Sequence, residues 1–283
     1  MGLSILTNVA SLNAQRNLTG TQDALASSIS KLSSGMRINK AGDDAAGLGI
    51  SESLKSQIRS ISQAQRNAND GISMSQVAEG AMNEMQGIVS RMRELSVQAA
   101  NSTLGNTERG YIHTEFKQLS QEVDRISKVT NFNGQDLLTG AASTGLTFQV
   151  GIYNTTDDRI AMSITKLNTS TLGATAASLK IQSQNLGSVT GAQKAISVFD
   201  TAIKQLSAAR AKVGASQNRM AVTVSNLATS HENLSAANSR IRDVDVAQET
   251  ASLTKSQILS QAGLAVLAQA NQLPQSALSL LRG

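Results

Sequence analysis

The sequence predicts a mainly α-helical protein: a long antiparallel helical bundle or coiled-coil rod, with a small β-hairpin and with its N- and C-terminal helices paired. Only one of the 283 residues is proline, so long helices are permitted almost everywhere. Two long stretches, 54–99 and 196–241, carry apolar residues at heptad spacing. Aromatic residues make up 2% of the chain and all lie between Tyr111 and Phe199, so both ends lack the bulkiest core formers.

The N-terminal segment predicts a first helix followed by a linker. A 4-3 spacing is kept by Leu18, Gln22, Leu25, Ile29 and Leu32. Glycines at positions 35, 42, 47 and 49 follow this pattern and indicate a hinge or extended linker before the next helix.

The first long helix is predicted from two heptad registers. One covers 54–72 and, after a two-residue slip, the other covers 74–99. A third register covers 112–126, behind a polar break at 101–107 that is typical of a loop. We therefore expect helices at 54–100 and 108–129.

A β-hairpin is predicted where the period of the pattern falls to two. Apolar residues alternate with small or polar residues over 146–152 and again over 160–164, and turn-forming residues occupy 154–158. This pattern predicts a hairpin over 146–164 with a five-residue loop. Residues 165–191 are rich in Ser, Thr, Asn and Gly, and we expect them to be irregular.

The second long helix has the most regular pattern. Fourteen positions from Ile196 to Ile241 alternate by three and four without a slip, and ten of them are apolar. One continuous helix of about 69 Å is expected. Because the stretch 54–99 has the same length, the two helices should pack against each other lengthwise.

The two chain ends are expected to depend on partners. Terminal segments with apolar faces, no aromatic residues and many small polar residues bury too little surface to be stable alone. They should order against each other and against copies of the same chain. The residues expected to form this polymerisation contact lie on the apolar faces of the two terminal helices: Leu18, Leu25, Ile29, Leu32, Ile258, Leu259, Val266 and Leu267.

Composition argues against an enzyme. The chain has no Cys and two His, which excludes disulfides, thiol nucleophiles, Cys-ligated zinc and multi-histidine metal sites. No nucleotide-binding or zinc-protease motif is present. The pair Asp43–Asp44 is expected to cap or order the linker rather than bind a metal. We expect no catalytic residue, cofactor or metal.

Two further partners are not expected. The net charge of +5 is spread along the chain without a basic cluster or stacking aromatics at the ends, so nucleic acid is disfavoured. Residues 256–281 lack charge, but Gln, Asn and Pro interrupt them, so no membrane span is predicted. The first residues do not form a secretory signal peptide.

Several motifs resemble those of bacterial flagellins. The N-terminal half contains LSSGMRIN at 32–39, DDAAGL at 43–48 and RMRELSVQAAN at 91–101. The C-terminal half contains SRIRDVD at 239–245, QILSQAG at 257–263 and AQANQLPQ at 268–275. The resemblance covers about 1–165 and 190–283, and it indicates a minimal flagellin that lacks variable outer domains.

The resemblance implies a division of the chain into inner-core and outer-core domains. The expected parts are 1–42, the N-terminal half of the inner-core helical domain; 43–191, the N-terminal part of the outer-core domain; 192–242, the C-terminal helix of the outer-core domain; and 243–283, the C-terminal half of the inner-core domain.

The resemblance also implies a function and partners. The chain would be the structural subunit of the bacterial flagellar filament, an extracellular homopolymer for motility. It would be exported unfolded by a chaperone and the type III export apparatus, and polymerised at the tip beside cap and hook-junction proteins. Arg91, Leu95 and Glu115 match the surface recognised by Toll-like receptor 5 in animal hosts. A hook–filament junction protein and a soluble coiled-coil interaction protein remain alternatives.

Overall fold

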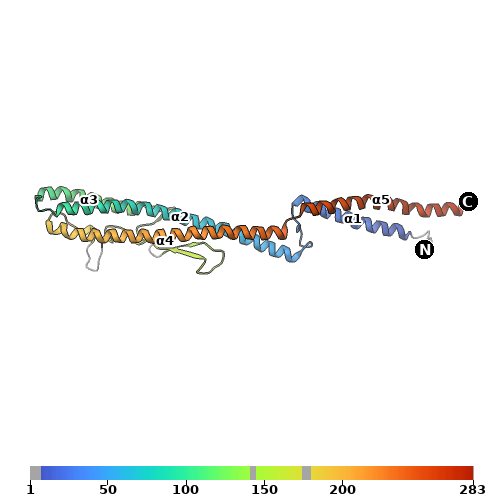
Figure 1. Ribbon diagram of the computed structural model, residues 1–283, viewed down its shortest axis with the longest axis horizontal. Coiled ribbons are helices and arrows are strands. Elements are labelled where there is room, and N and C mark those ends of the chain that lie inside the picture. The colour runs from blue at the N-terminus through green and yellow to red at the C-terminus, as the bar shows by residue number, and fades with distance from the viewer. Residues whose placement is uncertain (1–7, 141–144, 174–179, 283) are drawn as a thin grey trace. The chain divides into compact units, whose positions relative to one another are not determined.

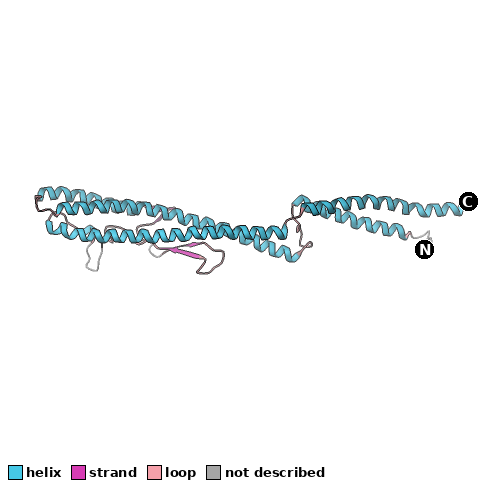
Figure 2. Cartoon of the chain, in the orientation of Figure 1, coloured by secondary structure: helices cyan, strands magenta, loops and turns pink. Residues whose placement is uncertain are grey.

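The computed structural model describes residues 8–140, 145–173 and 180–282, with the backbone alone for 273–282 (Figure 1). The elements in chain order are α1 (Val9–Ser34), α2 (Ala45–Ala99), α3 (Asn106–Val129), β1 (Asn131–Phe132), β2 (Gln135–Asp136), β3 (Leu146–Gln149), β4 (Arg159–Met162), the 3-10 helix η2 (Ile181–Ser183), α4 (Val189–Arg242) and α5 (Val246–Arg282). Helices dominate and the strands form small hairpins (Figure 2). The predicted fold class is confirmed.

The chain forms two compact units. The terminal unit comprises Met1–Ile58 and Glu232–Gly283, and the central unit comprises Arg59–His231. The boundaries lie inside α2 and α4, because each of these helices contributes to both units. Of the sequence-based boundaries, 42/43 lies in the linker between α1 and α2, and 242/243 lies at the end of α4. The assignment to inner-core and outer-core domains stays a prediction.

The core of the central unit is formed by the apolar heptad positions that the sequence predicts. We call this line of positions along the helices the seam. Its buried side chains come from α2, α3 and α4 and include Met85, Met92, Leu95, Ile112, Phe116, Val123, Phe199, Leu206 and Val213. All fourteen seam positions from Ile196 to Ile241 are buried or half-buried. The rings of Phe116 and Phe199 meet edge-on, with centroids 5.9 Å apart. The 3-4 spacing therefore predicted the buried side of α4 correctly.

Two polar residues on the seam, Arg210 and Asn238, have partners across it. The Arg210 guanidinium donates through Nη1 to Gln86 Oε1 at 2.9 Å and lies 3.7 Å from Glu79 Oε1. In the terminal unit, Ser51 Oγ donates to Asn238 Oδ1 at 2.8 Å. Such pairs are satisfied in one register only, so they favour a single alignment of the helices.

The long helices begin earlier than the seam predicts. Asp44 caps α2 by accepting a hydrogen bond from Gly47 N–H at 2.8 Å, so α2 begins at Ala45 and includes the glycines expected in the linker, Gly47 and Gly49. The expectation that both belong to a linker was wrong, because this cap offsets their low helix propensity. Asp43 accepts from the amides of Asn39 and Lys40 at 3.0 and 2.8 Å.

Arg109 closes the C-terminal end of α2. Its Nε donates to the carbonyl of Ala99 at 3.0 Å and its Nη2 donates to the carbonyl of Asn101 at 2.9 Å. The side chain is buried, and its positive charge lies where the helix dipole is negative. Arg109 therefore fixes the turn between α2 and α3.

The predicted hairpin is present with shorter strands. β3 and β4 pair antiparallel, with Leu146 opposite Met162 and Gln149 opposite Arg159. The amides of Val150 and Gly151 both donate to the carbonyl of Asp158, at 2.8 and 3.0 Å. This two-to-one pairing is a bulge that ends the ladder, so the connection is longer than the five residues predicted. A second hairpin, β1–β2, was not predicted.

In its described residues, the segment between β4 and α4 is irregular apart from η2, and it places several apolar side chains in the core. These buried side chains are Ile164, Leu167, Leu172, Ile181 and Leu186. Leu186 N–H donates to His113 Nδ1 on α3 at 3.4 Å, and the imidazole stacks on Phe116 with centroids 5.8 Å apart. Burial, and then the nearby Lys117, lower the pKa of His113 below its ordinary 6.5. The described parts of this segment thus contribute side chains to the core.

Candidate assembly and recognition surfaces

The terminal unit contains an antiparallel pair of helices, α1 and α5, which lie side by side in Figure 1. Asn8 Nδ2 donates to the carbonyl of Ala270 at 2.7 Å, and Ser11 Oγ donates to Asn271 Oδ1 at 2.8 Å. The first turn of α1 therefore lies beside the region of α5 around residue 270. The sequence expectation that the N- and C-terminal helices pair agrees with this arrangement.

The contact between the two helices is narrow. Leu18 and Ala270 are its buried apolar residues. A Cβ atom on Gly263 would lie 3.3 Å from Leu18 Cδ1, so the absence of a side chain at 263 lets Leu18 approach the α5 backbone. Leu25, Leu32 and Leu267 are half-buried. A contact of this width leaves much of each helix uncovered.

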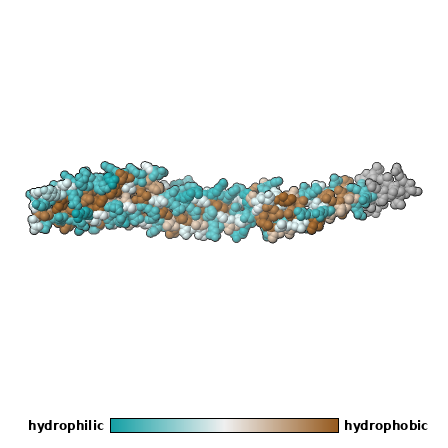
Figure 3. Space-filling model, turned by 90° about the horizontal axis from the view of Figure 1, so that it is seen from above, coloured by the Kyte–Doolittle hydropathy of each residue, from teal (hydrophilic) through white to brown (hydrophobic). Residues whose placement is uncertain are grey.

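The uncovered part of the pair includes large hydrophobic residues that are exposed. Its large hydrophobic residues are 49% to 61% exposed, and we refer to them as the apolar surface: Val9, Leu12, Ile29, Val246, Ile258, Leu259, Leu264 and Val266. Hydrophobic residues reach the surface over this stretch in Figure 3. Exposed apolar residues gathered on two elements are typical of an interaction site.

The predicted polymerisation residues divide into two groups. Ile29, Ile258, Leu259 and Val266 belong to the apolar surface, whereas Leu18, Leu25, Leu32 and Leu267 are buried or half-buried within the unit. The prediction omitted Val9, Leu12, Val246 and Leu264. Hydrophobicity in the sequence marked these positions, but the pattern could not show which side of each helix its neighbour covers.

A charged cluster joins α2 and α3 in the central unit. Arg91 donates to Glu115 Oε1 through Nη2 at 2.9 Å and Nε at 3.1 Å, and its Nη1 donates to Glu94 Oε2 at 3.1 Å. These bonds, first to Glu115 and then to Glu94, raise the pKa of Arg91 above its ordinary value. The side chains of Arg91 and Glu115 are about half exposed, so they form part of the surface.

Leu95 has a different environment from this charged cluster. It is 1% exposed and belongs to the core of the central unit. The structure therefore brings Arg91 and Glu115 together on the surface but places Leu95 beneath it. The seam pattern, which required a buried Leu95, describes this residue better than a role in direct recognition.

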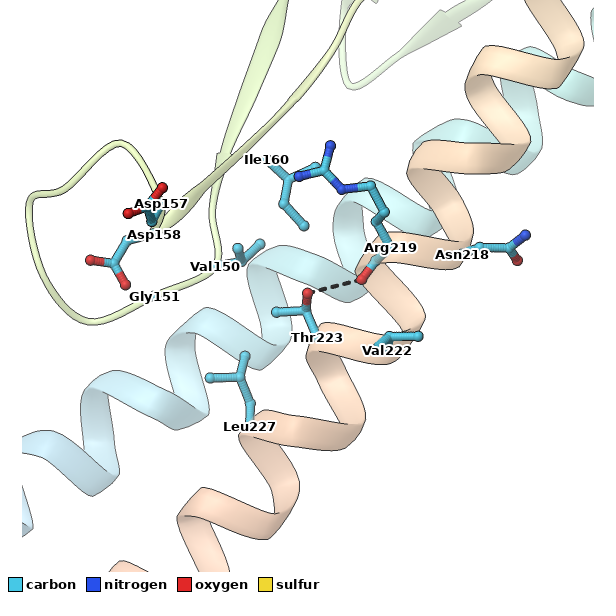
Figure 4. Close-up of a pocket in the computed structure, with 10 residues that line it drawn as sticks. All are labelled: Val150, Gly151, Asp157, Asp158, Ile160, Asn218, Arg219, Val222, Thr223 and Leu227. Atoms are coloured by element: carbon cyan, nitrogen blue, oxygen red, sulfur yellow. Dashed lines mark hydrogen bonds between the residues drawn. The ribbon is translucent and has the colours of Figure 1, made fainter.

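An open groove lies between the β3–β4 hairpin and α4 (Figure 4). Its volume is about 590 Å³, and its lining includes Val150, Ile160, Val222 and Leu227. The dashed line in Figure 4 joins Thr223 Oγ1 to the carbonyl of Arg219, a bond internal to α4. This lining offers hydrophobic contact but no arrangement of a nucleophile with a base.

The described part of the chain offers neither a metal site nor a membrane span. Within those residues, no group of three or more His, Cys, Asp or Glu side chains is placed to hold a metal ion. None of the described helices is both long and apolar enough to cross a membrane.

Comparison with known proteins identifies the family. The model for the bacterial flagellin N-terminal helical region matches residues 5–143, and that for the C-terminal helical region matches residues 196–281. Flagellin of Halalkalibacterium halodurans is 44% identical over 275 residues, which cover 97% of this chain and 98% of the relative. Flagellin of Bacillus subtilis is 44% identical over 301 residues, with the same shares covered.

A solved structure shares the fold. A putative flagellar hook-associated protein from Vibrio parahaemolyticus superposes with a TM-score of 0.60 at 11% identity, covering 71% of this chain and all of that one. The family models and the full-length relatives account for both halves of the sequence. The chain belongs to the bacterial flagellin family and is a structural subunit of a flagellar filament.

Proposed function

We propose that this flagellin polymerises through the apolar surface of the α1–α5 pair. The observation that carries the proposal is the exposure of eight large hydrophobic residues on one narrow helix pair. Fully burying one such side chain contributes about 1.5–3 kcal/mol. Contacts with neighbouring copies would bury these residues, and a head-to-tail contact that does not close on itself extends into a filament.

A charge on the apolar surface tests this proposal. Val266 is 58% exposed, so Val266→Glu should change the free energy of unfolding of the monomer by less than about 0.5 kcal/mol. In the filament the carboxylate would be buried without a partner, which costs several kcal/mol. The critical concentration for seeded growth, followed by light scattering, should therefore rise at least about tenfold.

Gln121→Glu is the matched control. Gln121 lies on α3 in the central unit, away from the apolar surface of the α1–α5 pair. It is also exposed, and the substitution adds the same charge. Growth of this variant should stay close to wild type. Wild-type growth of Val266→Glu would refute the proposal, and a lowered melting temperature would show that Val266 belongs to the monomer fold.

We propose export and assembly partners on the basis of family membership. The chain would pass unfolded through the type III export apparatus with a chaperone, and then fold at the filament tip beside cap and hook-junction proteins. Freedom from Cys supports this route, because no disulfide can form in the unfolded chain. The filament built by flagellins is extracellular, which gives the proposed location of this subunit.

Recognition by Toll-like receptor 5 is proposed for the surface that contains Arg91 and Glu115. Their half exposure and their salt bridge at 2.9 Å support a preformed, charged patch on adjacent helices. Leu95 would act by packing α2 beneath that patch, since it is buried. The receptor would then contact Arg91 and Glu115 directly. Leu95 would affect binding only by setting the position of α2.

The alternatives have less support. A hook–filament junction protein would share this fold, but the full-length relatives at 44% identity are named flagellins. A soluble coiled-coil interaction protein would not require an apolar surface on its terminal helices. The flagellin family is one of structural proteins, and we propose that this chain likewise has no enzymatic activity or cofactor.

A further inference from the structure

The two linkers of the terminal unit pair with each other. Arg37 N–H donates to the carbonyl of Arg242 at 2.6 Å, and Val244 N–H donates to the carbonyl of Gly35 at 3.1 Å. Between these bonds, Met36 lies opposite Asp243 in an antiparallel bridge. We call this pairing of 35–37 with 242–244 the linker clasp. It joins the α1–α2 linker to the junction between α4 and α5.

The Arg242 guanidinium connects the clasp to α2. Its Nε donates to the thioether Sδ of Met36 at 3.0 Å, and its Nη1 donates to Glu52 Oε1 at 2.7 Å. The Arg242 side chain is 17% exposed and the Glu52 side chain 49%, so this group of contacts lies at the edge of the unit, where solvent reaches it. A thioether is a weak acceptor, which makes Met36 the weaker of these two anchors.

Met36 differs from the other methionines that the structure describes. Six of them are at most 3% exposed: Met74, Met82, Met85, Met92, Met162 and Met220. Met36 is only half-buried. Oxidation of sulfur follows its exposure to the oxidant, so the core methionines are protected and Met36 is open to attack.

We propose that Met36 is an oxidant-sensitive modification site and that its sulfoxide opens the linker clasp. The oxidant is a hydroperoxide such as hydrogen peroxide. The sulfur lone pair attacks one peroxide oxygen, the O–O bond breaks and an S–O bond forms. The departing hydroxide takes the proton of the transferred hydroxyl and leaves as water. The thioether is oxidised by two electrons and the peroxide is reduced.

The added oxygen does not fit the present contact. It becomes the acceptor for Arg242 Nε, and an N–H···O bond alone needs about 2.9 Å between nitrogen and oxygen. The nitrogen and sulfur are already 3.0 Å apart, so the sulfur must move away from the guanidinium. Because Met36 lies between the two backbone bonds of the clasp, its side chain has to repack beside both of them, and we expect both bonds to weaken.

The first measurement is the position of oxidation. Purified full-length monomer is exposed briefly to hydrogen peroxide and its peptides are analysed by mass spectrometry. The peptide that contains Met36 should gain one oxygen at least about tenfold faster than peptides containing Met82 or Met92. Equal rates would overturn the proposal.

The second measurement is amide exchange in the clasp. After oxidation, hydrogen-exchange protection of the Arg37 and Val244 amides should fall about fivefold to tenfold, as expected when single hydrogen bonds are weakened. Methionine sulfoxide reductases should restore it. Unchanged protection in the oxidised protein, or a loss that reduction does not reverse, would contradict the proposal.

Met36→Leu is the matched control. Leucine has a similar volume and no sulfur, so the clasp should keep its protection both before and after peroxide. This variant retains all other methionines, including Met1, so it reports any effect of their oxidation. A loss of protection in peroxide-treated Met36→Leu would show that another residue is responsible.

Discussion

Gly71 provides a sharp test of how the β3–β4 hairpin packs on α2. Gly71 is buried in α2, and a Cβ atom there would lie 2.6 Å from Met220 Sδ and 3.1 Å from Phe148 Cδ1. Alanine favours a helix over glycine by about 1 kcal/mol. Overpacking of a close-packed site costs about 1–3 kcal/mol. Gly71→Ala should therefore lower the free energy of unfolding by about 1 kcal/mol.

Two other glycines of α2 provide the controls. Gly80 and Gly87 are exposed, and no atom lies within 4 Å of a Cβ placed on either. Gly80→Ala and Gly87→Ala should each raise the free energy of unfolding by about 0.5–1 kcal/mol. At these positions the substitution causes no clash, so only the greater helix propensity of alanine acts. The same substitution in the same helix is thus expected to have opposite signs at buried and exposed positions.

Thermal unfolding followed by circular dichroism measures the difference. For a domain of this size, 1 kcal/mol corresponds to about 2–4 °C in melting temperature. In a Met220→Ala background the clash between a Cβ atom at position 71 and the Met220 sulfur is absent. Gly71→Ala should therefore become stabilising in that background. If Gly71→Ala stabilises the wild-type chain as much as Gly80→Ala does, the hairpin and α4 do not pack on Gly71 as described.

Two further predictions concern His113 and Arg109. The pKa of His113 is lowered in the folded chain, so its contribution to stability is complete above 6.5 and is lost as pH falls through 6.5 towards the folded pKa. Chemical denaturation across this range should show a decline in unfolding free energy that His113→Gln reduces, and an unchanged decline would contradict the assignment. Arg109→Met removes the hydrogen bonds at the end of α2 and should cost about 1.5–3 kcal/mol by the same assay. Arg109→Lys keeps the positive charge but not the two hydrogen bonds of the guanidinium, so its loss of unfolding free energy should be smaller. Equal stability of Arg109→Met and wild type would contradict the capping role.

Periodicity explains which parts of the fold were predictable. The seam of α4 was predicted because the same buried environment recurs every three or four residues, as at Phe199, Ile203 and Leu206. Helix starts depend on single caps, which periodicity does not show; the capping role expected for the pair Asp43–Asp44 came instead from residue type, and Asp44 does cap α2. Burial of Leu167 and Leu186 was not predicted, because irregular segments have no period from which to infer it.

Some of the missed structure did have a signal in the sequence. The β1–β2 hairpin turns at Asn133 and Gly134, whose φ angles are 50° and 79°, and Asn-Gly is a strong indicator of such a two-residue turn. The candidate assembly surface had a weaker signal. A hydrophobic face on α1 and another on α5 predict contact, but they do not show that Leu18 is covered while Ile258 is exposed. That division depends on the width of the helix contact.

The antiparallel pairing of distant segments sets an order in which the chain can fold. Arg210 and Gln86 are separated by 124 residues along the sequence, Arg37 and Ile241 by 204, and Asn8 and Ala270 by 262. Closing a longer loop costs more chain entropy, and each contact formed shortens the loop that remains for the next. Structure should therefore start in the middle of the chain and extend outwards in both directions. Because α1 pairs with α5, neither terminal helix has its partner until the whole chain is available for folding. An N-terminal half alone therefore has no partner for α1.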